Sequence, residues 1–146
     1  MAIKKILCPI DFSPQSGAAM DYAVALARDT GAELMLLHVA EPAIALGEAV
    51  PQMPDTAECR RELAAVIVDP EIRVDRRVVV GYAAEQILAS ASQRPVDLIV
   101  MGTHGRTGFS HLLMGSVAEC VVRKASCPVL TLKAAVPTSP KVPSLV

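Results

Sequence analysis

The sequence predicts a three-layer α/β/α domain built on a five-stranded parallel sheet. Five short apolar runs alternate with four helical patterns along the 146 residues, and such alternation with short connections favours right-handed crossovers between parallel strands. Hydrophobic residues make up 52% of the chain and aromatic residues only 3%, which predicts a core of layered aliphatic side chains. The length suits one domain. We expect this domain to span residues 1–134 and a flexible tail containing proline and serine to span 135–146.

The first strand and helix are delimited by local signals. The apolar run 3–10 is a buried strand. Ser13 is suited to the N-cap of a helix and Pro14 to its first turn, while Gly31 can supply a left-handed C-cap. The next apolar run, 34–39, predicts a strand covered on both faces, which we place at the centre of the sheet.

The middle of the chain is less regular. Residues 41–54 contain three prolines and predict a loop. Asp55 followed by Glu58 has the spacing of a capping box, which predicts a helix that ends just before Pro70. The run 72–80 alternates at first and then becomes all valine, which is typical of a strand near the sheet edge.

The last third repeats the strand and helix pattern twice. Apolar residues at helical spacing predict a helix over 84–94, followed by a buried strand over 96–101. Ser116 and Glu119 again have capping-box spacing, which predicts the start of the fourth helix. The run 128–132 is the final strand.

Charge and cysteine usage exclude several classes of function. The formal net charge is −1 and the basic residues are scattered, so nucleic-acid binding by bulk electrostatics is not expected. No apolar run approaches the roughly 18 to 20 residues that span a bilayer, and no signal-peptide pattern follows Met1, so we expect a cytoplasmic protein without membrane contact. The four cysteines form no Cys-x-x-Cys pair, which favours reduced core thiols over a metal site.

A glycine-punctuated segment follows the fourth predicted strand. Gly102, Gly105 and Gly115 precede Ser116 at the start of the last helix. Glycine lets successive main-chain N–H groups converge on an anion, and a helix N-terminus favours negative charge. The segment therefore suits a polyphosphate, to which Arg106, His104 and His111 could add contacts.

A plain structural interpretation of the same residues stays open. Glycines after a strand often serve only as tight turns, and Ser116 can be a helix N-cap and nothing more. The P-loop signature and the Gly-x-Gly-x-x-Gly pattern after the first strand are both missing.

These residues resemble the universal stress protein family. Its nucleotide-binding members carry Gly, two residues, Gly, nine residues, then Gly followed by Ser or Thr, and the segment 102–116 matches every position. The resemblance extends over 3–133 and includes the opening stretch 6–13, the second-strand stretch 36–39 and the closing stretch 127–130.

The resemblance implies an adenine nucleotide alpha hydrolase-like fold with strand order 3-2-1-4-5 and a homodimer that pairs the last strands. It implies ATP as the ligand, alone or with Mg²⁺. From the residues themselves we expect no resident metal site and no catalytic residues. The residues that it implies for nucleotide binding are Pro9, Asp11, Val39, Met101, Gly102, Gly105, Gly115, Ser116 and Val117. From the residues alone, Asp11 can equally be a helix-start residue.

Three functions follow as alternatives. The first is an ATP-binding regulatory module in the stress response, the second a slow ATPase in which Asp11, His104 or His111 positions a water, and the third a nucleotide-free dimeric interaction protein.

Two departures from the family pattern bear on the ligand site. The stretch 41–71 is shorter than in many members, which predicts an opening in one wall of the pocket, and Tyr82 is expected to pack near it.

Overall fold

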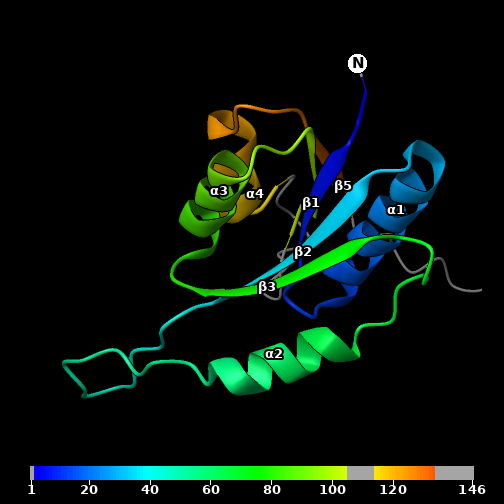
Figure 1. Ribbon diagram of the computed structural model, residues 1–146. Coiled ribbons are helices and arrows are strands. Elements are labelled where there is room, and N and C mark those ends of the chain that lie inside the picture. Colours follow the sequence, from blue (N-terminus) through cyan, green and yellow to red (C-terminus); the bar gives the residue numbers. More distant parts are fainter. Residues whose placement is uncertain (1, 105–113, 134–146) are drawn as a thin grey trace, which may run out of the picture.

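A five-stranded parallel sheet runs through the centre of the protein in the order β3-β2-β1-β4-β5 (Figure 1). The computed structural model describes residues 2–104 and 114–133. The strands are β1 Lys5–Pro9, β2 Glu33–Ala40, β3 Val74–Val80, β4 Leu98–Gly102 and β5 Val129–Leu132. The predicted fold class and strand order are confirmed. The central position belongs to β1, however, and the run expected there, 34–39, forms the interior strand between β1 and β3.

Two helices cover each face of the sheet. Helices α1 and α2 lie on one side and α3 and α4 on the other (Figure 1). Their bounds are α1 Pro14–Thr30, α2 Thr56–Ala65, α3 Ala83–Gln93 and α4 Ser116–Lys124. Successive strand residues point to opposite faces, so Leu36 packs in the core under α1 whereas Met35 and Leu37 pack in the core under α3 and α4.

The predicted helix caps of the first half are present. The Ser13 hydroxyl accepts the Ser16 N–H at 3.2 Å, and Gly31 closes α1 in the left-handed region with φ of 74°. The Asp55 carboxylate accepts the Glu58 N–H at 3.1 Å at the start of α2. Each of these bonds satisfies a group that a helix end leaves without a helical partner.

Helix α2 ends earlier than the sequence predicts. Its last residue is Ala65 rather than a residue next to Pro70. The Arg76 guanidinium on β3 donates to the carbonyls of Leu63 at 3.2 Å and Val66 at 2.8 Å. This residue from a neighbouring strand satisfies carbonyl groups at the helix end, so the chain can leave the helix there.

The start of α4 also differs from the prediction. Gly115 is the N-cap, with φ of −72° and ψ of 164°, and no side chain in 2–104 or 114–133 caps the helix. Ser116 is therefore the first helical residue, and the expected capping box at Ser116 is wrong. The Gly115 N–H donates to the Thr103 carbonyl at 2.6 Å, a contact that fixes Gly115 outside the helix.

Residues 41–54 form an arm that projects from the body (Figure 1). Ala43 and Gln52 pair across it through two main-chain hydrogen bonds of 3.1 and 2.7 Å. Its large apolar side chains are exposed; they are Ile44, Leu46, Val50 and Met53. None of the helices in the described part of the chain has the length and apolar character needed to cross a membrane.

Candidate functional site

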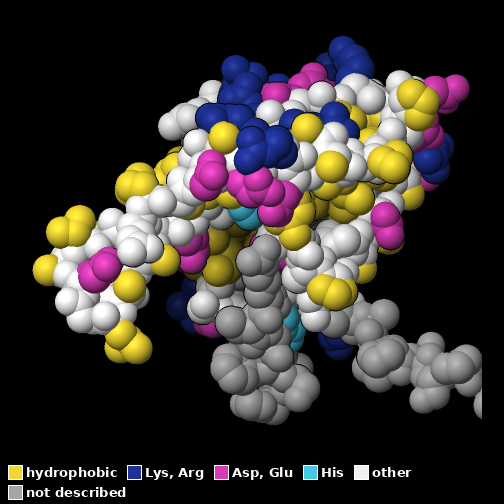
Figure 2. All heavy atoms as spheres, turned by 90° about the horizontal axis from the view of Figure 1, so that it is seen from below, with side chains coloured by type: hydrophobic (Ala, Val, Ile, Leu, Met, Phe, Trp, Pro, Cys, Tyr) yellow, Lys and Arg dark blue, Asp and Glu magenta, His cyan; other side chains and the backbone are white. Residues whose placement is uncertain are grey.

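A cavity of about 630 Å³ opens at the carboxyl ends of β1, β2 and β4. The order of the sheet reverses direction between β1 and β4, and ligands of open parallel sheets bind at such a switch point. Figure 2 looks at this end of the molecule and shows a hollow with hydrophobic and histidine side chains inside it and acidic side chains on its rim. The volume lies within the range of small-molecule sites, about 300–1,000 Å³.

Eight of the nine residues expected to bind nucleotide line this one cavity. They are Pro9, Asp11, Val39, Met101, Gly102, Gly115, Ser116 and Val117. The ninth, Gly105, lies outside the described residues, as do Arg106 and His111. The cavity therefore unites positions that are more than 100 residues apart in the sequence.

The end of β4 and the start of α4 meet at the two described glycines of the motif. A Cβ at Gly115 would lie 3.1 Å from the Thr103 carbonyl oxygen, and a Cβ at Gly102 would lie 3.4 Å from the Gln15 and His104 carbonyl oxygens. The Gly115 φ is negative, so close approach of the main chain, rather than a left-handed turn, explains the glycine here. The described ends of the segment 102–116 thus lie side by side, through the contact of Gly115 with Thr103.

Helix α4 presents its N-terminus to the cavity. Its first two residues, Ser116 and Val117, line the cavity together with Ala118. The first N–H groups of a helix have no partner within it, and no described side chain caps this end. The first-turn carboxylate of Glu119 is paired with Arg123 at 3.0 Å. The site therefore offers main-chain donors and the positive end of a helix dipole.

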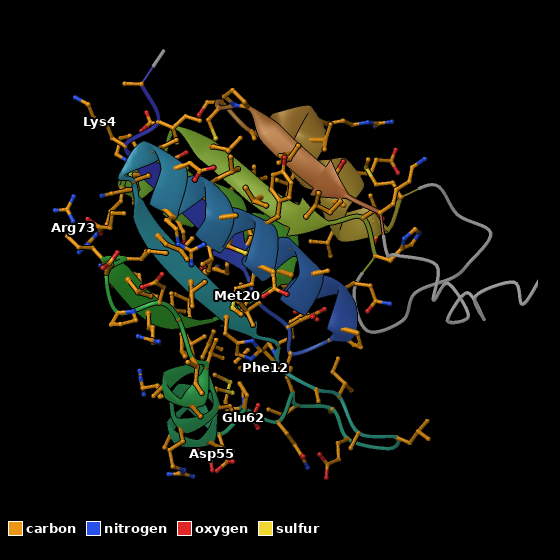
Figure 3. The ribbon with its side chains drawn as sticks, turned by 90° about the vertical axis from the view of Figure 1, so that its right-hand side faces the viewer. Lys4, Phe12, Met20, Asp55, Glu62 and Arg73 are labelled. Atoms are coloured by element: carbon orange, nitrogen blue, oxygen red, sulfur yellow. The ribbon has the colours of Figure 1, made fainter. Side chains whose placement is uncertain are left out.

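The opposite wall is acidic. Glu41 and Glu62 line it from the end of β2 and from α2, and across the described residues the cavity wall contains no lysine or arginine. The Glu41 carboxylate accepts the Ala83 N–H at 2.9 Å and so serves the first turn of α3. In Figure 3, Glu62 lies on the side of α2 turned toward Phe12, which also lines the cavity. A ligand anion is thus favoured at the α4 end only.

The turn between β1 and α1 brings Asp11 to the cavity. The Asp11 carboxylate accepts the Ser13 N–H at 2.9 Å, and the Asp11 N–H donates to the Ser16 hydroxyl at 3.3 Å. Phe12 takes a left-handed conformation with φ of 63°. Asp11 is therefore both a helix-start residue and a cavity residue, so the two interpretations of the sequence are compatible.

His104 adds a polar side chain to the cavity wall just after the end of β4. Its Nδ1 lies 3.0 Å from the Thr103 hydroxyl, while its Nε2 is buried and has no hydrogen-bond partner in the described part of the chain. Leaving a buried nitrogen without a partner costs about 1–3 kcal/mol. His104 lines the cavity, but this nitrogen has no exposed surface, so a ligand atom reaches it only if the ring moves.

Several cavity residues were not identified from the sequence. Cys59 and Glu62 come from α2, and His38 comes from β2. The pattern of the helix predicted after Asp55 placed Cys59 on its apolar face, but only tertiary packing shows that this part of α2 contributes to the cavity wall. Tyr82 does not pack into that wall: it is 57% exposed and lies outside the cavity.

The cysteines have no catalytic or metal-binding arrangement. Burial raises the pKa of the Cys8 thiol to about 12, so it stays protonated in the core. All four cysteines are free. In the ranges 2–104 and 114–133, no group of three or more His, Cys, Asp or Glu side chains is placed to hold a metal ion.

Comparison with known proteins decides the family. The model of the universal stress protein family matches residues 2–133. The chain belongs to this family. Universal stress protein MJ0531 of Methanocaldococcus jannaschii is 32% identical over 89% of this chain and 82% of its own length. A second universal stress protein, YxiE of Bacillus subtilis, is 30% identical over 88% of this chain and 98% of its own length.

Solved structures of universal stress proteins share the fold. The structure of protein MJ0577 superimposes with a TM-score of 0.75 at 28% identity and covers 92% of this chain and 98% of its own. MJ0577 is itself a universal stress protein of Methanocaldococcus jannaschii. The predicted family and the adenine nucleotide alpha hydrolase-like fold are thereby confirmed.

Proposed function

We propose that this universal stress protein binds an adenine nucleotide in the cavity at the carboxyl ends of β1, β2 and β4, and that it acts as a nucleotide-dependent regulatory module. The observation that carries the proposal is the convergence of the end of β4 on the N-terminus of α4, at Gly102 and Gly115. A Cβ at Gly115 would crowd the Thr103 carbonyl oxygen at 3.1 Å, whereas a Cβ at Gly102 would lie at ordinary contact distance, 3.4 Å, from the Gln15 and His104 carbonyl oxygens. ATP is the ligand we expect, alone or with Mg²⁺.

The charge pattern of the wall orients such a ligand. Phosphates are favoured near Ser116 and Val117, where main-chain N–H groups and the helix dipole face the cavity. The carboxylates of Glu41 and Glu62 repel phosphate from the α2 side of the wall. Adenine and ribose would then lie near Asp11, whose carboxylate can accept hydrogen bonds from amino or hydroxyl groups.

Other members of the fold support the choice of ligand to test. A universal stress protein described in complex with cAMP superimposes with a TM-score of 0.68 at 23% identity. Another, from Archaeoglobus fulgidus, is described in complex with dAMP, with a TM-score of 0.65 at 23% identity. At this identity the likeness concerns the fold, so the identity of the ligand must be tested directly on this chain.

Ligand titration of thermal stability tests the proposal. A ligand that binds only the folded state stabilises it by about 2.7 kcal/mol at one hundred times its Kd. ATP, ADP, AMP and cAMP are compared with GTP and adenosine, each with and without Mg²⁺, and native mass spectrometry of gently purified protein identifies any nucleotide carried along. The absence of both a concentration-dependent shift and a bound nucleotide would contradict the proposal.

Slow ATP hydrolysis is the second candidate, because Asp11 and His104 both line the cavity, where either side chain could position a water. It predicts phosphate release that follows the protein through purification and disappears in Gly102→Val and Ser116→Pro variants. Equal release by these variants would assign the activity to a contaminant.

We further propose a homodimer through β5. This strand, Val129–Leu132, pairs with β4 on one side and forms the edge of the sheet. An apolar edge strand with unpaired main-chain groups favours pairing with a second copy. Light scattering coupled to gel filtration tests this, with Thr131→Pro as the variant expected to give a monomer, because in this register the Thr131 N–H points away from β4. A monomeric native chain would contradict it.

A further inference from the structure

The side chain of His38 ties the turn between β1 and α1 to β2. Its Nδ1 lies 2.7 Å from the Ile10 carbonyl oxygen, and the Ile10 N–H donates to the Leu37 carbonyl at 2.8 Å. Two consecutive residues of β2 therefore hold both polar main-chain groups of Ile10. This residue directly precedes Asp11, the carboxylate of the cavity wall.

The acceptor at this bond fixes the proton on His38. A carbonyl oxygen can only accept, so Nδ1 must carry the hydrogen. In the neutral imidazole the second nitrogen, Nε2, is then an acceptor. The bond to the Ile10 carbonyl persists in the charged ring as well, because both nitrogens carry protons there.

The ring of His38 also contacts the strained residue of the turn. The Phe12 and His38 rings lie with their centroids 4.7 Å apart and their planes tilted by 40°. Phe12 has φ of 63°, a left-handed conformation that residues with a Cβ rarely adopt and that surrounding contacts must maintain. His38 thus holds the residues on both sides of Asp11, one by a hydrogen bond and the other by its ring.

We propose that His38 is a positioning residue for nucleotide binding. Its Nδ1–H and its ring hold the Ile10 to Phe12 turn in the one conformation that directs Asp11 to the cavity. The inference rests on the proposed function, since it concerns the same cavity. The proposed role requires His38 to donate a hydrogen bond from Nδ1 to the Ile10 carbonyl. A phenylalanine ring has no such donor.

Two substitutions separate the hydrogen bond from the ring. Asparagine places its side-chain nitrogen close to where histidine has Nδ1, so His38→Asn keeps the donor and loses the ring. His38→Phe keeps a ring and loses the donor. We expect His38→Phe to bind AMP about five- to tenfold more weakly than the native chain, the equivalent of one lost hydrogen bond. His38→Asn should bind AMP at least about threefold more tightly than His38→Phe, because only His38→Phe leaves the carbonyl of buried Ile10 without its donor.

Two readouts do not depend on a ligand. Nitrogen NMR of the native chain should show the His38 proton on Nδ1 whenever the ring is neutral; a neutral ring protonated on Nε2 would overturn the proposal. The Ser13 amide, which donates to the Asp11 carboxylate, should exchange with solvent faster in His38→Phe than in His38→Asn.

The outcomes distinguish this inference from the proposed function. If the native chain binds AMP and His38→Phe binds it equally well, the positioning role falls and the nucleotide site stands. If the native chain binds no adenine nucleotide, both the proposed function and the role of His38 in nucleotide binding are wrong. Unchanged Ser13 exchange in His38→Phe would show that His38 does not hold the turn.

Discussion

Adding one methyl group at Gly115 tests the close approach of β4 and α4. The new Cβ of Gly115→Ala would lie 3.1 Å from the Thr103 carbonyl oxygen, a few tenths of an ångström inside ordinary contact. The Thr103 oxygen belongs to the main chain and accepts a hydrogen bond from the Gly115 N–H at 2.6 Å. It therefore cannot rotate away from the new Cβ. Alanine is also a poorer N-cap than glycine. Together these effects should cost about 1–2 kcal/mol of the free energy of unfolding.

The matched control is the same substitution where space is open. Gly17 lies in the first turns of α1, and a Cβ there meets nothing within 4 Å. Gly17→Ala should therefore stabilise the protein by about 0.5–1 kcal/mol through its helix propensity. Near this chain length 1 kcal/mol corresponds to about 2–4 °C in Tm. Thermal unfolding should move in opposite directions for the two variants.

The two variants should differ in ligand binding as well. A shift of Gly115 moves the N–H groups of Ser116 and Val117 relative to the cavity, so Gly115→Ala should weaken ATP binding about tenfold, the value of one hydrogen bond to a charged group. Gly17→Ala should leave affinity within about twofold, since its site is open and outside the cavity wall. A Gly115→Ala protein as stable as the native chain, with native affinity, would refute the close-approach argument.

Three further predictions concern the frame of the site. Ser13→Ala removes the acceptor of the Ser16 N–H and should cost about 1 kcal/mol in denaturant unfolding; no loss would show that the cap is dispensable. Leu63→Ala removes the one buried side chain of α2 and should lower the free energy of unfolding by about 2–4 kcal/mol. A variant as stable as the native chain would show that α2 does not pack on the sheet. Cys8, with its pKa near 12, should resist iodoacetamide at pH 8 in the native state while half-buried Cys59 reacts, as followed by mass spectrometry. Equal labelling of both thiols would contradict the burial of Cys8.

Local chemistry explains what could be predicted from the sequence. The caps at Ser13 and Asp55 and the C-cap at Gly31 depend on a few neighbouring residues, and all three are present. Strands β1, β2 and β4 were recognised from continuous apolar runs, which lie buried in the sheet. The glycine motif identified Gly102, Gly115 and Ser116 of the cavity wall, because it combines a strand end with a helix start; the other predicted wall residues came from the family resemblance.

Contacts between distant segments explain what was missed. Helix α2 ends early because Arg76, from β3, takes carbonyl groups at its end. Gly115 rather than Ser116 caps α4 because Thr103 binds it from the end of β4. The sequence around Glu62 does not predict that this residue lines the cavity, because its position there depends on how α2 packs over the sheet.

The central claim is that main-chain N–H groups at the start of α4 bind the phosphates of an adenine nucleotide. Amide NMR of the native chain during titration with AMP and, separately, with adenosine tests it most directly. The account predicts saturable shifts of the Ser116 and Val117 amides with AMP that adenosine does not produce. Saturable binding of AMP that leaves these two amides unmoved, or equal shifts with adenosine, would contradict it.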